Sequence, residues 1–219
     1  EVGANPSVAL LRVQKGQADI AGDGLNGSDI IALRNDPTWS KDLVGLPVPW
    51  PQWLQMNTRM KPFDNKLVRQ AVAMAINRVD LIKVINGQGQ LMEGQLPPMI
   101  PGYDTTLQGY PFDPAQARRL LAKAGYPHGF STTLLYSDQP GLPSNVNQVI
   151  QQQRAAVGIT VKLRDFPDPS TYLNYIAQPN KAPIFTSGWW EDYPDPYDFI
   201  ALQLTCAAAV PGGVNYTFY

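Results

Sequence analysis

The sequence has few of the residues that metal sites and nucleophilic mechanisms require. Its 219 residues include one cysteine, Cys206, and one histidine, His128. A Cys/His zinc site needs about four ligands, and a Ser-His-Asp or Cys-His mechanism would have to use His128. Residues 125–129 (GYPHG) are typical of a tight turn, so we interpret His128 as a solvated turn residue. We therefore expect no metal, no cofactor and no histidine-dependent catalysis.

Charge is also scarce. Charged residues make up 16% of the chain and leave a net charge of −1, with no basic stripe of the kind that contacts nucleic-acid phosphates. No apolar run reaches the roughly 18 residues of a membrane-spanning helix. The chain opens at Glu1 with neither methionine nor an apolar signal segment. We expect that a targeting segment was removed or that the chain is an internal piece, and that nucleic acid is not a partner.

Helical and strand patterns alternate along most of the chain. The clearest helix is predicted over residues 64–77, where apolar residues recur on one face and Asp64 is expected to cap the start. Other helices are predicted over 6–16, 28–35, 78–85, 113–124, 144–157, 170–177 and 198–206, and strands over 18–22, 53–57, 131–136, 159–163 and 183–189. This order predicts an α/β fold with at least partly parallel strands.

The most unusual segment is residues 188–199, GWWEDYPDPYDF, which directly follows a predicted buried strand. Its aromatic residues are Trp189, Trp190, Tyr193, Tyr197 and Phe199, and its acids are Glu191, Asp192, Asp195 and Asp198. Ligand sites in open α/β sheets lie at the carboxyl ends of strands. A carboxylate beside aromatic walls suits a cationic group, such as an α-amino group, through an ion pair and a cation–π contact.

Other interpretations of the same segment stay open. The tryptophans could belong to the core, and the acids could cap helices or coat a loop. A calcium loop is disfavoured, because Asp192, Asp195 and Asp198 are spaced at three and prolines stiffen the backbone between them. Glu191 and Asp192 could act as a paired acid and base in a secreted hydrolase of oligosaccharides. Adjacent residues on an extended chain point to opposite sides, which weakens that pair.

Six segments together resemble the bacterial extracellular solute-binding proteins of family 5, the peptide- and nickel-binding class. They are ALLRVQKGQADIAG (9–22), NTRMKPFDNKLVRQAVAMAINRVDLIKVINGQGQ (57–90), LPPMIPGYD (96–104), YPFDPAQARRLLAKAGYPHGF (110–130), VIQQQRAAVGITVKL (149–163) and GWWEDYPDPYDF (188–199). The matches are in order and cover nearly the whole chain. The resemblance implies a solute-binding component of an ABC importer that captures oligopeptides or related small solutes and delivers them to a membrane permease.

The resemblance also implies the fold and the domain plan. The fold would be an α/β lobe of a class-C (type II) periplasmic binding protein, with a mixed, partly parallel sheet flanked by helices. Residues 1–54 would be a remnant of a first lobe with the hinge crossing, and 55–219 a second lobe cut before its closing segment. The whole protein would be a monomer, not an enzyme, and would lie in the periplasm or be anchored to the outer face of the cell membrane.

Site residues follow from the same resemblance. Asp192 aligns with the aspartate that pairs with the ligand's α-amino group, and Trp189, Trp190 and Tyr193 would line the pocket. Dipeptide-binding relatives hold the ligand carboxylate with an arginine after the strand equivalent to 131–136. Ser137, Asp138 and Gln139 stand there instead. The resemblance therefore implies longer peptides or oligosaccharides rather than dipeptides, and the ligand's identity stays open.

Cys206 has an implied partner. Family relatives often carry a second cysteine soon after an Asn-Tyr pair, and Asn215-Tyr216 stands near the last residue of this sequence. We expect a cysteine just beyond Tyr219, bonded to Cys206 in the intact protein. The alternative is an unpaired, buried cysteine that acts as a small hydrophobic residue.

Overall fold

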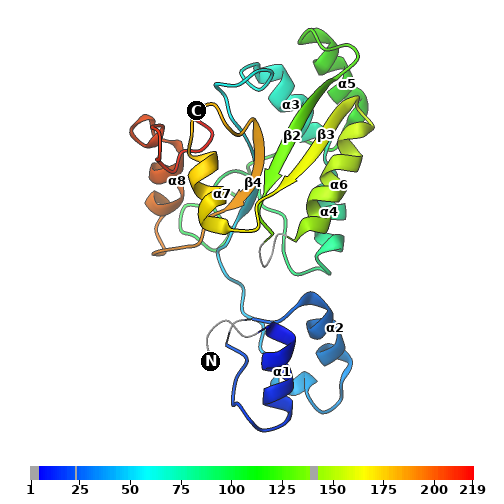
Figure 1. Ribbon diagram of the computed structural model, residues 1–219, viewed down its shortest axis with the longest axis vertical. Coiled ribbons are helices and arrows are strands. Elements are labelled where there is room, and N and C mark those ends of the chain that lie inside the picture. Colours follow the sequence, from blue (N-terminus) through cyan, green and yellow to red (C-terminus); the bar gives the residue numbers. More distant parts are fainter. Residues whose placement is uncertain (1–4, 23, 139–142) are drawn as a thin grey trace. The chain divides into compact units, whose positions relative to one another are not determined.

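A computed structural model describes residues 5–22, 24–138 and 143–219 (Figure 1). The chain divides into two compact units, residues 1–48 and 49–219. The first unit contains α1 (Pro6–Gln14), α2 (Gly27–Asn35) and a short 3-10 helix (Ser40–Asp42). The assignment of residues 1–54 to a first lobe with its hinge crossing stays a prediction.

The strand predicted over residues 18–22 is wrong. These residues form no regular element, and Ile20 is 78% exposed. The described part of the first unit contains no other strand with which they could pair. A side-chain contact links α1 to α2 instead, because the Ser7 hydroxyl donates to an Asp29 carboxylate oxygen at 2.7 Å.

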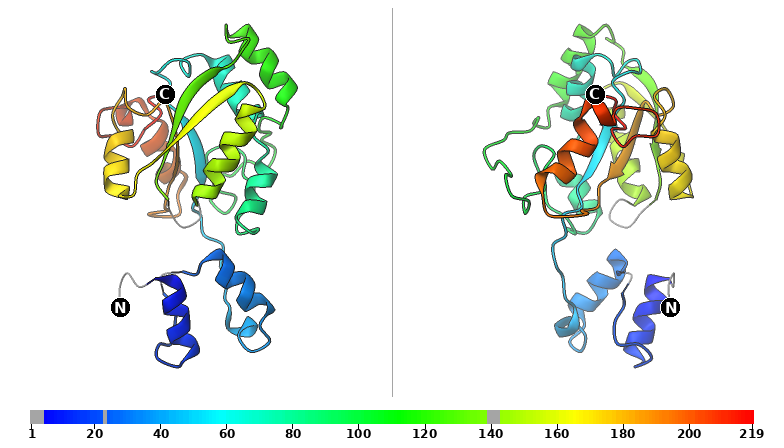
Figure 2. Two further views of the ribbon diagram at one scale, coloured as in Figure 1. Left: turned by 45° about the vertical axis from the view of Figure 1, so that its right-hand side comes forward. Right: turned by 90° about the vertical axis from the view of Figure 1, so that its left-hand side faces the viewer.

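The second unit is built on a four-stranded sheet in the order β1-β4-β2-β3. Its strands are β1 (Gln52–Met56), β2 (Phe130–Tyr136), β3 (Ile159–Asp165) and β4 (Ile184–Gly188). Strand β2 runs parallel to β3 and β4, and β1 runs antiparallel to β4. This confirms the predicted mixed, partly parallel sheet flanked by helices, which two further views also show (Figure 2).

Helices cover both faces of this sheet. They are α3 (Lys66–Met74), α4 (Arg78–Val84), α5 (Pro114–Lys123), α6 (Ser144–Ala155), α7 (Pro169–Ile176) and α8 (Pro196–Leu204), followed by a 3-10 turn (Cys206–Ala208). Leu134 and Ile184 pack in a core with α3, α5 and α6. Their chain neighbours Leu135 and Phe185 pack in a second core with α7, because successive strand residues point to opposite faces.

Helix starts follow local capping chemistry. Asp113 caps α5 as predicted, since its side chain accepts from the Gln116 amide at 2.8 Å. The cap of α3 is Asn65 rather than the predicted Asp64, because the Asn65 side chain accepts from the Leu67 amide at 2.9 Å. The predicted helix 64–77 is correspondingly shorter. It ends at Met74, and Asn77 already caps α4.

One charged residue lies inside the first core. Arg154, on α6, is fully buried, and its guanidinium has no hydrogen-bond partner among the described residues. Desolvation lowers the pKa of Arg154 to about 9, because burial disfavours the charged form. Val146 and Ile150 share this inward face of α6, as the sequence predicted.

Cys206 is exposed at the start of the turn that follows α8. The alternative of a buried, unpaired cysteine is therefore wrong. The disulfide with a cysteine beyond Tyr219 stays a prediction.

Candidate functional site

The segment 188–199 begins at the carboxyl end of β4, as the sequence predicted. Because β2 and β4 are parallel, their carboxyl ends meet at the same edge of the sheet. The antiparallel strand β1 starts at this edge, with Gln52 opposite Gly188. The Trp189 amide donates to the Pro51 carbonyl at 3.2 Å, which extends the pairing by one residue on each strand. The segment entering β1 and the segment leaving β4 therefore form one surface.

Aromatic side chains from both segments gather on this surface. The ring centroids of Trp50 and Trp190 are 5.2 Å apart, and Trp190 is 60% exposed. Trp189 is half-buried, and its indole nitrogen has no hydrogen-bond partner among the described residues. Tyr193 is exposed. Trp189, Trp190 and Tyr193 lie on one loop, and their role in lining a ligand pocket stays a prediction. The sequence analysis did not single out Trp50, which contacts Trp190 from the other segment.

The four acids of the segment divide by what they contact. Asp195 caps α8 by accepting from the Tyr197 amide at 2.8 Å. Asp198 is fully buried in the first turn of α8 and accepts from the Asp192 amide at 3.0 Å. Asp192 itself is exposed, and within the described residues its carboxylate makes no hydrogen bond or ion pair. The capping interpretation thus holds for Asp195, while Asp192 is free to meet a cation.

The electrostatics of the loop fit this division. Partial desolvation, followed by the negative charge of Asp198, raises the pKa of Tyr193. Like any tyrosine hydroxyl at neutral pH, that of Tyr193 can donate a hydrogen bond. Glu191 is half-buried beside Asp192.

Polar groups without partners lie under the same edge. Ser137, directly after β2, is buried, and its hydroxyl has no partner among the described residues. Asn147, on α6, accepts from the Thr186 hydroxyl at 3.1 Å, but its amide nitrogen has no partner there. Asp138 accepts from the Ser144 amide at 2.9 Å. Gln139 is the third of the residues that stand where dipeptide-binding relatives have an arginine, and it lies outside the described residues.

The structure was also compared with the expectations for His128, for metal binding and for membrane-spanning helices. His128 is exposed in a turn, as predicted. The described residues contain no group of three or more His, Cys, Asp or Glu side chains that could hold a metal ion. Among those residues, no helix has the length and apolar character needed to cross a membrane.

Comparison with known families decides which class of protein carries this arrangement. The family model described as "Bacterial extracellular solute-binding proteins, family 5 Middle" matches residues 1–210. The chain belongs to this family. The resemblance found on six sequence segments is thereby confirmed.

Curated relatives from this family match part of the chain. The glutathione-binding protein GsiB of Salmonella typhi is 44% identical over 123 residues, which cover 56% of this chain and 24% of GsiB. GsiB of Pectobacterium atrosepticum is 45% identical over 122 residues, covering 55% of this chain and 24% of that protein. Each match therefore covers about a quarter of the relative.

Solved structures match over nearly the whole chain. Periplasmic binding protein DppA from Helicobacter pylori, in complex with the peptide STSA, superposes with a TM-score of 0.83 at 30% identity, covering 98% of this chain and 41% of DppA. Clavulanic acid biosynthesis oligopeptide binding protein 2 gives 0.84 at 25% identity, over 99% of this chain and 42% of that one. The predicted fold, a lobe of a periplasmic binding protein, is confirmed, and the chain spans less than half of these structures.

Proposed function

We propose that this chain is a ligand-binding lobe of the solute-binding component of an ABC importer, and that the ligand is an oligopeptide or a related small solute with a free α-amino group. The observation that carries this proposal is the exposed Asp192 carboxylate, which makes no hydrogen bond or ion pair within the described residues and lies on the same loop as Trp190 at the carboxyl edge of the sheet. An α-amino group there would gain a charge-assisted hydrogen bond and a cation–π contact. Trp189, Trp190 and Tyr193 would line the pocket.

The relatives support this ligand class. GsiB is named a glutathione-binding protein, and the DppA structure contains the peptide STSA. Glutathione and STSA differ in length and in their first peptide bond, but each carries a free α-amino group and a carboxylate. A site that recognises the amino group through Asp192 would serve either class.

Transport would depend on lobe closure. A ligand that contacts two lobes stabilises the closed form of the protein, and only that form would dock on a membrane permease. The protein would act as a monomer in the periplasm or on the outer face of the cell membrane, with no catalytic step. The named relatives are binding proteins, and the alternative of a hydrolase that uses Glu191 and Asp192 receives no support from them.

Calorimetry on the intact protein tests the proposal. STSA, glutathione and N-acetyl-STSA would be titrated in parallel, together with a neutral oligosaccharide. We expect the protein to bind an amino-bearing ligand. N-acetylation removes the positive charge and should weaken the affinity at least tenfold, which corresponds to a loss of about 1.4 kcal/mol. Equal affinity for acetylated and free peptide, or binding of the oligosaccharide alone, would contradict the α-amino proposal.

A further inference from the structure

The segment from residue 87 to 112 joins α4 to α5 without a helix or strand of its own. It is nevertheless held at several points. Ile100 and Pro97 are buried, although the segment is rich in glycine and proline. Residues of α4 and α8 bond to it, and Gln70 of α3 donates to the Tyr110 hydroxyl at 3.1 Å.

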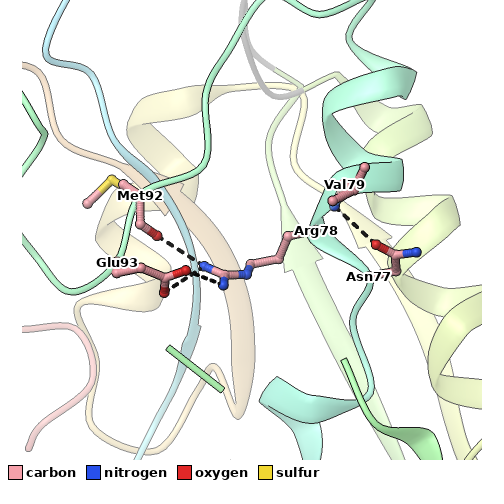
Figure 3. A network of polar contacts seen from close by, with 5 residues as sticks. All are labelled: Asn77, Arg78, Val79, Met92 and Glu93. Carbon is pink, nitrogen blue, oxygen red and sulfur yellow. Dashed lines mark hydrogen bonds and ion pairs between the residues drawn. The ribbon is translucent and has the colours of Figure 1, made fainter. Parts of the chain in front are cut away.

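At α4 the segment is held by a two-pronged ion pair (Figure 3). The Arg78 guanidinium donates from Nη2 to Glu93 Oε1 at 2.5 Å and from Nη1 to Glu93 Oε2 at 3.0 Å. Nη1 also donates to the Met92 carbonyl at 3.0 Å. Both side chains are partly buried, at 38% and 27% exposure, so the pair is better shielded than an ordinary surface pair.

Gly109 closes the segment on this ion pair. A Cβ at Gly109 would collide with the Glu93 carboxylate and would approach Arg78. A side chain at Gly109 would therefore displace the Glu93 carboxylate from its position beside Arg78. Arg78 itself contacts the segment at Met92 and Glu93.

At α8 the contact is made by Gln95, two residues after Glu93. Its side-chain nitrogen donates to the Phe199 carbonyl and to the Gln203 side-chain oxygen, each at 3.3 Å. A Cβ added at Gly102, further along the segment, would lie 3.8 Å from the Pro196 ring. The segment thus bonds to the middle of α8 and passes near its first turn.

The first turn of α8 in turn holds the loop that carries Asp192. The buried Asp198 carboxylate accepts the Asp192 amide at 3.0 Å. Contacts therefore run without a break from Arg78 through Glu93 and the segment backbone to Gln95, then through α8 to the loop at residues 189–195.

We propose that Arg78, Glu93 and Gln95 are positioning residues for the loop at 189–195, and through it for Asp192. They touch no ligand. They fix α8 against the segment 87–112, and α8 fixes the backbone amide of Asp192. This inference extends the proposed function, but it also makes a claim about the loop that can be measured without ligand.

Hydrogen exchange of the intact protein tests it, followed in peptides that cover residues 189–195. The variants would be Gln95→Leu, Gly109→Ala and Arg78→Met, with the exchanged pair Arg78→Glu/Glu93→Arg. We expect exchange of these amides to become about threefold to thirtyfold faster in the first three, the range found for residues that couple indirectly to a site. The exchanged pair should restore part of the protection, because the ion pair is remade without the Met92 bond.

The matched control is Asp80→Asn/Lys83→Met. It removes an ion pair of the same helix, with Nζ and Oδ1 at 2.9 Å, that does not reach the segment. Loop exchange at the wild-type rate in Gln95→Leu, or faster exchange that extends equally to β2, would overturn the proposal. The second result would mean that the whole unit is merely less stable.

A calorimetric arm separates this inference from the proposed function. With STSA or glutathione as the probe, Gln95→Leu should bind about threefold to thirtyfold more weakly and the control should bind like wild type. If wild type binds neither probe, the proposed ligand class fails while the exchange measurement still decides the positioning role. If the probe binds Gln95→Leu as well as wild type, the positioning role for the ligand is refuted.

Discussion

The core beneath α3, α5 and α6 and the carboxyl edge of the sheet are built on the same strands but follow opposite rules. The clustered side chains of the core are apolar and buried, and Arg154 is the charged exception. At the edge, large aromatic rings are exposed, and several buried polar groups have no partner among the residues that the structure describes. A core maximises contacts within the chain, whereas a binding edge leaves contacts unmade for a ligand. This difference between the two regions supports the proposal that the ligand binds at the edge.

The largest effect on stability should come from removing an apolar side chain from the core. Leu134→Ala removes a fully buried side chain from the centre of the sheet and should lower the free energy of unfolding by about 2–5 kcal/mol. Urea unfolding measures it. The edge variant Trp190→Ala is the counterpart and should change stability by less than about 0.5 kcal/mol. Similar losses in both variants would remove the distinction between core and edge.

Arg154 is the exception within the core, and replacing it should stabilise the protein. Arg154→Met exchanges a buried cation, which has no partner in the described parts of the chain, for an apolar chain of similar length and should raise the free energy of unfolding by about 1–4 kcal/mol. The matched control, Arg118→Met on the exposed side of α5, should have little effect. A large loss of stability in Arg154→Met would mean that the guanidinium has a partner in the intact protein.

The burial of Arg154 also predicts that the stabilising effect of Arg154→Met depends on pH. The pKa of Arg154 is lowered to about 9 in the folded state, so the unfolded state binds more protons between that pH and the ordinary arginine pKa. Folding then becomes more favourable as pH rises through about 9. The stability advantage of Arg154→Met should therefore be full at pH 7 and shrink towards pH 10.5. An advantage that does not change over this range would contradict the desolvation argument.

At the edge, Asp192 should matter for affinity rather than for stability. Asp192→Ala in the intact protein should weaken binding of an amino-bearing ligand by about 1.5–3 kcal/mol, the scale of a charged hydrogen bond. Unfolding should be almost unchanged, because the carboxylate is exposed and makes no described contact. Asp80→Asn, an exposed acid on α4, is the control. Unchanged calorimetric affinity in Asp192→Ala would remove Asp192 from the site.

The smallest effect concerns a cap that belongs to neither region. Asp113→Ala removes the acceptor for the Gln116 amide at the start of α5 and should lower the free energy of unfolding by about 1 kcal/mol. Asp113→Asn should keep most of the stability, because an amide oxygen can still accept this hydrogen bond. Equal losses in both variants would point to charge rather than capping.

The regular elements of the second unit could be predicted because their signals are local. The apolar spacing of α3 and the Asp113-Pro114 start of α5 each specify their element within a few residues. The failure at residues 18–22 has a different origin. A strand needs a partner, and sequence pattern alone does not say whether one is present.

The site was predictable only in part, for a related reason. Asp192 and Trp190 share one loop, so their proximity was visible in the sequence. Trp50 lies far away along the chain and joins Trp190 only through the antiparallel pairing of β1 with β4. The support that Gln95 gives to α8 likewise crosses 104 residues of sequence to reach Phe199. Contacts of this range are set by topology, which local periodicity does not contain.

The pairing of Gln52 with Gly188 has a mechanical consequence. The chain passes from the first unit into the second at Pro49, and the next residues, Trp50 and Pro51, touch Trp190 and Trp189 directly. A movement of the chain at this junction would act on Trp190 and Trp189 through one ring contact and one backbone hydrogen bond. The fluorescence of Trp190, obtained as the difference between wild type and Trp190→Phe, would therefore report movement of the junction.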